Sequence, residues 1–530
     1  MPCIRFGLIL ISGLLLSSVQ ATANSDFRFR LTADPVTLDW NLAHTSYETP
    51  IIMNLMEGLV EEGPDLKPRP ALAEKWDISS DGKLYTFTLR AGVKWSDGRP
   101  LKASDFVDSW RRLLSPKTKS PYASFLFDVE GAEAFHAGKA KESAVGVKAI
   151  GENQFQVRLA KTVPYFIHLP TFWVTYPIRL DLIKKHGGQW ATPGKIATLG
   201  PFRLAEWQKG KQIVLSKNTD YFNAASVERP SIQNVTAVIE PDDAKARSLF
   251  EEGKLDVLLN ATTADLLKAK ALKDVRVEQY PYLATYYVGF NVNSGPMKNI
   301  GARRAVARAL SAERENLPAL LQGGQLPARG WIPPGIDGNA SGVQLGGSLY
   351  DARSDLARAG FAEGRGFPKA QFWVERFDGA EAMAAYLAKS LREKLGIELE
   401  PRVGSSAEFQ QALNSGQTAI FVNHWGADFP DAANFFEVFS SGSGTVYTGW
   451  KSPEYDRYME QARATLDQPS RLVAYAAAEK ILLERDIVVL PLFYRKNAVL
   501  LGERVGSFQI SPLNYLFFKQ IRLKQSGATP

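Results

Sequence analysis

Hydrophobic positions change their period several times along the chain, which predicts a mixture of strands and helices. In 84–89, Tyr85, Phe87 and Leu89 share one face at a spacing of two, after an Asp-Gly turn. The same alternation returns at 155–159. Both segments are therefore predicted to be strands with one buried face.

Between these strands the apolar spacing becomes helical. Phe106, Trp110 and Leu113 recur three or four residues apart, and Ser104 is predicted to cap the helix that carries them. A further helical run covers 51–59, and the prolines after it break regular structure.

The second half of the chain alternates strand-like and helical segments. These are 371–374 (extended), 381–395 (helical), 397–399 (extended), 470–484 (helical) and 487–490 (extended). Gly396 suits the left-handed residue that ends a helix. Such crossovers favour an α/β fold with mixed or parallel sheets.

The N-terminus has the pattern of a secretory signal. Arg5 precedes an apolar run at 6–19, and small residues follow at 21–23, so 1–23 is predicted to be a cleaved signal peptide. The run is shorter than the roughly 20 residues of a membrane span. The single cysteine, Cys3, lies before the run rather than at its end, so a lipid anchor is not expected. A free periplasmic protein is expected.

Length and charge narrow the class of protein further. At about 150 residues per domain, 530 residues suggest roughly three domains and a large core. The chain has 63 Lys and Arg against 56 Asp and Glu, and the two signs are interspersed. No block of one sign exists, so nucleic-acid binding is not indicated.

A search for catalytic and metal-binding motifs finds none. The chain lacks the serine-hydrolase elbow, the zinc-protease helix, the phosphate-binding loop and the calcium-binding loop. The five histidines have no metal-ligand spacing: they are His44, His136, His168, His186 and His424. We therefore expect no metal and no cofactor, and an enzyme activity has no support.

Aromatic residues are frequent, with 29 Phe, 18 Tyr and 11 Trp, and several stand beside polar residues, as at 280–287 and 423–428. Aromatic side chains with a few fixed polar groups are typical of a ligand cavity. Taken alone, each of them is better explained by core packing.

Seven short segments together resemble the periplasmic oligopeptide-binding proteins of ABC importers, the bacterial extracellular solute-binding proteins of family 5. They are 56–59, 73–76, 87–90, 94–98, 120–124, 283–287 and 425–428. They follow the family's order and approximate spacing over nearly the whole chain. The segments 120–124 and 163–166 point to the oligopeptide and murein-peptide branch.

The resemblance implies a two-lobe clamshell of the periplasmic solute-binding fold with an additional inserted domain, three domains in all. Domain I is discontinuous, at 24–56, 181–284 and 505–530; domain II is 57–180 and domain III is 285–504. Hinges are expected at 282–287 and 505–515. Closure would bury the ligand, so each ligand charge needs a partner inside.

The resemblance also implies the ligand-binding residues. The carboxylate of Asp428 would pair with the α-ammonium group of a peptide, whereas an isolated Asp before Phe-Pro would instead cap a turn. The other positions that match the family's ligand contacts are Tyr122, Tyr282, Tyr287, Trp425, Gly426 and His44.

The chain departs from the family where a peptide's carboxylate would bind. The usual basic positions align with Val422, Leu413 and Ala380, and His44 stands where an acidic contact would be. Either Arg376 or another base receives the carboxylate, or the ligand has no free carboxylate there. A substituted murein peptide, a longer peptide or a non-peptide amine would fit the second case.

The expected function is capture of a peptide-like ligand by a monomeric receptor and its delivery to an inner-membrane ABC permease with its ATPase. The same fold could instead carry a muropeptide, a nickel chelate or an oligosaccharide. A secreted hydrolase is the weaker alternative, because the search for catalytic motifs finds none. The sequence is also compatible with a chaperone or sensory role outside import.

Overall fold

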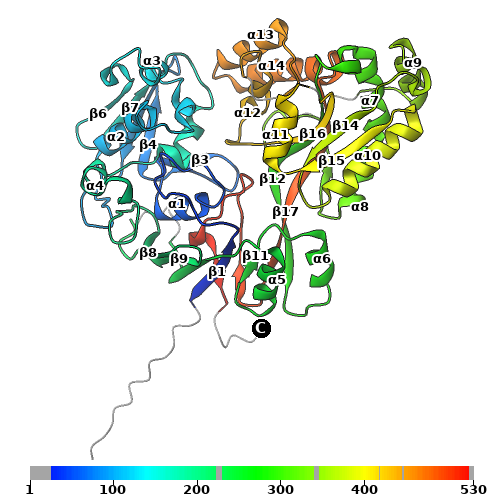
Figure 1. Ribbon diagram of the computed structural model, residues 1–530. Helices are drawn as coiled ribbons and strands as arrows, with labels where there is room; N and C mark the ends of the chain where they lie inside the picture. The colour runs from blue at the N-terminus through cyan, green and yellow to red at the C-terminus, as the bar shows by residue number, and fades with distance from the viewer. Residues whose placement is uncertain (1–24, 223–228, 340–344, 417, 444–446, 525–530) are drawn as a thin grey trace, which may run out of the picture.

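The computed structural model describes residues 25–222, 229–339, 345–416, 418–443 and 447–524, so the predicted signal peptide lies outside it. Two lobes stand side by side above a shared base, in which β1 (Asp26–Leu31), β11 (Val257–Leu258) and α5 (Asp243–Glu251) lie close together (Figure 1). Strands cover both halves of the chain and helices surround them, as the α/β prediction expected. None of the helices in the described ranges is long and apolar enough to cross a membrane.

The first sheet brings together distant parts of the sequence. Its strand order is β1-β10-β9-β8, and β1 runs parallel to β10. The other strands are β8 (Phe202–Gln208), β9 (Gln212–Lys217) and β10 (Asn234–Ile239). Near the C-terminus Phe518 packs against Phe27 and Phe29, at 6.1 and 5.1 Å between ring centroids. Three separate stretches of chain thus form one core.

The second sheet lies within 57–180, the range predicted for domain II. It is antiparallel in the order β4-β5-β7-β6, and α2 (Ala103–Leu114) packs on it. Its strands are β4 (Ala73–Ile78), β5 (Leu84–Leu89), β6 (Val147–Ile150) and β7 (Gln154–Arg158). Both strands predicted here are confirmed. The predicted cap at Ser104 is wrong: α2 starts at Ala103, so its N-cap is Lys102, two residues earlier, and the Asp105 carboxylate accepts from the Lys102 N–H at 3.1 Å.

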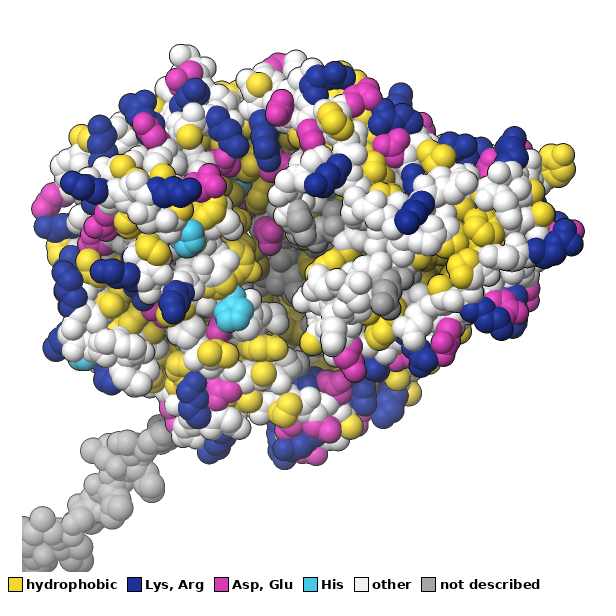
Figure 2. Space-filling model, turned by 45° about the horizontal axis from the view of Figure 1, so that its top comes forward, with side chains coloured by type: hydrophobic (Ala, Val, Ile, Leu, Met, Phe, Trp, Pro, Cys, Tyr) yellow, Lys and Arg dark blue, Asp and Glu magenta, His cyan; other side chains and the backbone are white. Residues whose placement is uncertain are grey.

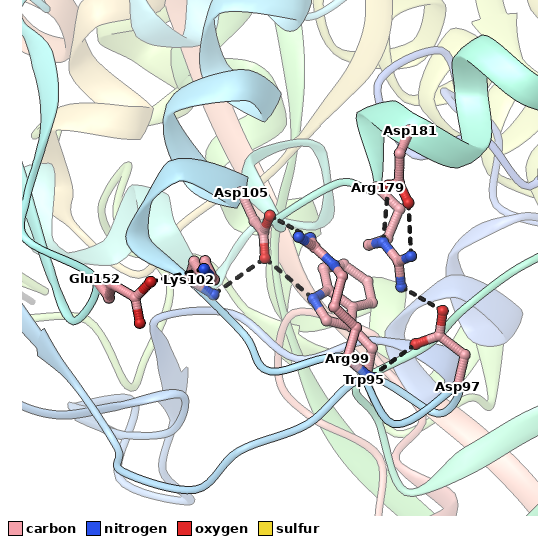
Figure 3. A network of polar contacts seen from close by, with 8 residues as sticks. All are labelled: Trp95, Asp97, Arg99, Lys102, Asp105, Glu152, Arg179 and Asp181. Atoms are coloured by element: carbon pink, nitrogen blue, oxygen red, sulfur yellow. Dashed lines mark hydrogen bonds and ion pairs between the residues drawn. The ribbon is translucent and has the colours of Figure 1, made fainter.

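The segment 94–98, one of those that carried the resemblance, is structural. Trp95 is buried and its indole N–H donates to Asp105 at 3.1 Å (Figure 3). The Arg179 guanidinium donates to the Asp97 carboxylate at 2.6 Å and to the two carboxylate oxygens of Asp181 at 2.9 and 2.7 Å, so it links the two aspartates. These bonds hold the loop after β5 against α2 and the end of domain II.

The third sheet forms the core of the other lobe. Its order is β11-β17-β12-β16-β14-β15, with β13 paired to β17; β14 is parallel to β15 and β16, and the remaining pairs are antiparallel. Its strands besides β11 are β12 (Arg276–Phe290), β13 (Leu326–Pro327), β14 (Ala370–Glu375), β15 (Leu399–Gly404), β16 (Ile420–Gly426) and β17 (Val489–Leu501).

The predicted crossover in this lobe is present with shifted limits. Helix α10 (Ala380–Leu395) connects β14 to β15 and ends at Gly396, whose φ of 71° is left-handed. The strand predicted at 397–399 begins only at Leu399, and the strand predicted at 487–490 is the much longer β17. Because β17 pairs with β12 along most of its length, it extends far beyond the apolar run that predicted it.

The two lobes are joined by a pair of long strands. β12 and β17 pair from Arg276 opposite Leu501 to Gly289 opposite Val489, and their register shifts between Pro281 and Thr285. The predicted hinge at 282–287 lies at this irregularity. The strand that pairs with it is β17, around residue 495. The segment 505–515, where the second hinge is expected, lies beside the first one, because the Leu283 N–H donates to the Pro512 carbonyl at 2.8 Å. Both hinges stay predictions.

The remaining elements complete the lobes. The other helices are α1 (Thr49–Leu55), α3 (Ala132–His136), α4 (Leu180–His186), α6 (Thr263–Ala269), α7 (Ile300–Ser311), α8 (Leu317–Leu321), α9 (Leu349–Arg358), α11 (Ser406–Asn414), α12 (Ala432–Phe436), α13 (Pro453–Arg463) and α14 (Gln468–Lys480). The other strands are β2 (Val60–Glu62), β3 (Pro68–Pro70), β18 (Val505–Ser507) and β19 (Arg522–Leu523).

Candidate ligand-binding cleft

A cavity of about 910 Å³ lies between the lobes, and the molecular surface is hollowed there (Figure 2). Its walls come from the ranges predicted for all three domains. The lining includes 29–32, 44–47, 258–260 and 513–516 from the predicted domain I, Tyr122, Phe172 and Trp173 from the predicted domain II, and 376–379, 426–428 and Arg495 from the predicted domain III. A ligand in this cavity would contact both lobes at once.

Asp428 lies in the cleft wall just after β16. Its backbone N–H donates to the side-chain oxygen of Asn434 at 3.2 Å, and the Trp425 indole N–H donates to the same oxygen at 3.0 Å. Burial raises the pKa of the Asp428 carboxyl above its usual range. A hydrogen bond from the Asn434 side chain opposes this rise in the pKa, but the described residues provide no ion pair, so no protein cation balances the charge of this carboxylate.

Three tyrosines surround the Asp428 carboxylate. Burial, together with the negative charge of Asp428, raises the pKa of Tyr122 to about 12, and the same two causes raise the pKa of Tyr515. The pKa of Tyr282 is also raised, mainly by burial and in addition by the negative charge of Asp428. The Tyr122 ring meets Trp173 edge-on at 5.6 Å. The carboxylate thus lies in an aromatic surround that excludes much of the water.

Gly426 allows Tyr282 to approach the strand. A Cβ atom at this position would lie 2.7 Å from the Tyr282 hydroxyl oxygen, so any larger residue here would force the Tyr282 side chain to move. β16 holds this geometry by pairing Gly426 with Ala284 of β12, and the Ala427 N–H donates to the Leu283 carbonyl at 2.8 Å. The glycine therefore places a tyrosine hydroxyl directly against the backbone of the cleft wall.

Two predicted residues do not line the cleft. Trp425 is half-buried and acts through Asn434, the residue that also holds the Asp428 backbone. Tyr287 is 1% exposed, and its ring packs edge-on against Trp331 at 5.1 Å within the core. The prediction that Tyr287 contacts ligand is therefore wrong, because the sheet turns this ring into the core.

The structure brings Asp428, Gly426, Tyr122, Tyr282 and His44 to one cavity. His44 is an exposed residue at its edge, with Nδ1 3.2 Å from the Leu42 carbonyl oxygen. The positions where basic residues were expected are buried apolar side chains; these are Ala380, Leu413 and Val422.

Among the cleft residues that sequence reasoning missed are Tyr515 and Arg495. Neither stands in a recognisable motif, and each reaches the cleft only through its tertiary position. Arg376, the predicted alternative base, also lines the cleft but is paired with Glu381 at 3.1 Å. Within the described ranges no group of three or more His, Cys, Asp or Glu side chains could hold a metal ion.

Comparison with known proteins places the chain in a family. Residues 67–447 match the model for the bacterial extracellular solute-binding proteins, family 5. The chain is 30% identical to the periplasmic oligopeptide-binding protein OppA of Salmonella typhimurium, over 89% of this chain and 88% of the relative. It is 28% identical to a probable deoxycholate-binding periplasmic protein of Escherichia coli, YgiS, over 97% and 98% of the two chains.

Solved structures agree with these relatives. The unliganded open form of the murein tripeptide-binding protein MppA superposes with a TM-score of 0.79 at 25% identity, covering 95% of this chain and 98% of that one. The chain therefore belongs to the bacterial extracellular solute-binding proteins of family 5. Its fold is the two-lobe solute-binding fold with an additional domain, and the family's members are binding proteins.

Proposed function

We propose that this protein is a periplasmic receptor that captures peptides or peptide-like ligands with a free ammonium group between its lobes. It then delivers them to an inner-membrane ABC permease driven by its ATPase, and it performs no bond chemistry. The observation that carries the proposal is the Asp428 carboxylate, which lies in the cleft wall without an ion-pair partner among the described residues.

The electrostatics of the cleft support an ammonium ligand. An ionised carboxylate in a partly desolvated site is costly, and a ligand cation that pairs with it removes this cost. Tyr122 and Tyr282 add polar hydroxyls on apolar rings, a combination suited to the main chain of a peptide. Relatives named as binding oligopeptides and murein peptides support the same class of ligand.

A second candidate is an amphipathic carboxylic acid. Its support is Arg495, a cleft guanidinium without an ion pair in the described residues, together with the aromatic wall of Phe172 and Trp173. The relative named as deoxycholate-binding covers nearly the whole chain. Such a ligand would leave Asp428 unpaired, so the peptide class accounts for more of the cleft.

Native mass spectrometry of the freshly purified mature protein tests the proposal. Release of bound peptides with free amino groups would support the proposal. Release of a bound steroid acid would support the second candidate. A nickel chelate, an oligosaccharide or a muropeptide would each appear with its own mass. The proposal would be overturned if cargo without an amine were retained and peptides did not replace it.

A further inference from the structure

The charged side chains of the cleft wall are mostly neutralised in pairs. Three arginines there each have an acidic partner that also lines the cavity. The pairs are Arg30 with Asp243 at 2.7 Å, Arg247 with Asp265, and Arg376 with Glu381 at 3.1 Å. These six groups leave no net charge for a ligand to balance.

Three charged groups remain. Asp378 accepts hydrogen bonds from the backbone N–H and the hydroxyl of Thr263, at 2.8 and 3.0 Å. Asp428 has no ion pair among the described residues, and neither has Arg495. The guanidinium of Arg495 donates to the Tyr286 hydroxyl at 3.3 Å and lies 5.7 Å from the centre of the Tyr282 ring. The described part of the cleft thus presents two carboxylates without an ion pair, Asp378 and Asp428, and Arg495 is its one guanidinium without an ion pair.

Arg495 has a defined position in the fold. It stands on β17 where that strand's pairing with β12 is irregular, between Tyr494, which faces Thr285, and Lys496, which faces Pro281. It is half-buried, so its charge is only partly hydrated. Tyr282 lines the same cavity as Asp428, and its ring centre is 5.7 Å from the Arg495 guanidinium. Burial raises the pKa of this phenol most, Arg495 lowers it, and the charge of Asp428 raises it. One tyrosine therefore neighbours both groups.

We propose that Arg495 binds a carboxylate of the same ligand whose ammonium group binds Asp428. The inference rests on the proposed function and narrows its substrate class to short zwitterions, such as peptides with both termini free. Arg495 then binds the ligand carboxylate in place of the basic residues expected at three other positions, where this chain has Val422, Leu413 and Ala380. A planar guanidinium can donate two parallel hydrogen bonds to a carboxylate, which gives direction as well as charge.

The position on β17 gives this contact a second consequence. The carboxylate would bind at the strand pair that joins the lobes, whereas Asp428 lies on the loop after β16. A ligand with both charges would therefore bridge the hinge strands and the wall of domain III. A ligand with only one charge would leave a half-buried charge unpaired, which costs affinity.

The experiment is calorimetry with alanine peptides of two to five residues, each as the free acid and as the C-terminal amide. The wild-type protein is expected to bind the best acid at least tenfold more tightly than its amide. Arg495→Gln is expected to lose this preference and to bind the amide as the wild type does. Arg495→Lys, which keeps the charge without the planar fork, should keep part of it.

Arg376→Gln tests the other base that could receive the carboxylate, an arginine of the same cleft that is paired with Glu381. The acid preference should survive in this variant, and its loss there instead of in Arg495→Gln overturns the inference. Equal binding of acid and amide by the wild type, or an acid preference that survives in Arg495→Gln, overturns the inference and leaves the proposed function intact. Failure of the wild type to bind any of these peptides overturns both. Circular dichroism of each variant verifies that it is folded.

Discussion

The change Asp428→Asn tests the ammonium site with almost no change of shape. Asparagine keeps the size of the side chain, and the backbone N–H that donates to Asn434 is retained. The substitution removes only the charge that a ligand ammonium would meet. Loss of one partner from a fully buried ion pair costs about 3–5 kcal/mol. Because Asp428 is half-buried, we expect about 2–3 kcal/mol, which is roughly a 30- to 150-fold weaker Kd.

Calorimetry with one tripeptide in free and N-acetylated form measures this loss. The wild type should prefer the free amine, and Asp428→Asn should bind both forms as weakly as the wild type binds the acetylated one. Asp378→Asn is the control, because it alters another carboxylate of the cleft that is already hydrogen-bonded to Thr263. An unchanged affinity of Asp428→Asn for the free amine, or an equal loss for both forms, refutes the assignment.

The pH dependence of binding follows from the same carboxylate. Its pKa is raised in the unliganded protein, so protonation on acidification neutralises it sooner than an ordinary aspartate. Wild-type affinity for a free-amine peptide should therefore fall as the pH decreases through this raised pKa. The Asp428→Asn variant should show a flatter profile over that range. Parallel profiles for the two proteins would contradict the assignment.

Three further predictions concern the walls, the lobes and the core. Gly426→Ala places a Cβ atom 2.7 Å from the Tyr282 hydroxyl oxygen. Calorimetry should therefore show a peptide affinity at least tenfold weaker, and the thermal midpoint of unfolding should change little. An unchanged affinity would contradict the contact. Tyr165→Phe removes the hydrogen bond of 3.1 Å that the Tyr165 hydroxyl donates to Glu437 of the other lobe, which is worth about 1 kcal/mol. Small-angle scattering of the ligand-free variant should therefore show a larger radius of gyration than that of the wild type. An unchanged radius would refute this role of the bond. Buried Glu479 has its pKa raised to about 7 by desolvation, so the folded state binds more protons than the unfolded state between pH 4.5 and 7 and stability falls as pH rises through that window. Glu479→Gln should then stabilise the protein by roughly 3 kcal/mol at pH 8 and by little near pH 4.5. Denaturant titration at both pH values measures this difference. An equal effect of the substitution at the two pH values would be inconsistent with the raised pKa.

The sequence predicted local structure best where apolar periodicity and burial coincide. The strand at β5 and the helix at α10 with its cap Gly396 have these signals within their own residues. The length of β17 depends on its pairing with β12, a partner about two hundred residues away. No local pattern contains that information, so the sequence predicted only the first residues of this strand.

The site divides in the same way. Asp428, Gly426, Tyr122 and Tyr282 lie in short segments that resemble the family, and the structure places them in one cavity. Tyr287 lies in the same kind of segment but faces Trp331 in the core, because a motif does not specify which side of the sheet a ring occupies. Arg495 can be recognised only by comparing which charged side chains of the cleft already have ion-pair partners, and this comparison requires the three-dimensional structure.

The crystal structure of the protein with a bound short peptide tests the central claim most directly. The account predicts lobes closed around the peptide, with its ammonium nitrogen about 2.7–2.9 Å from an Asp428 carboxylate oxygen. A peptide bound outside this cleft, or bound inside it with its ammonium group on water while Asp428 faces solvent, would contradict the account.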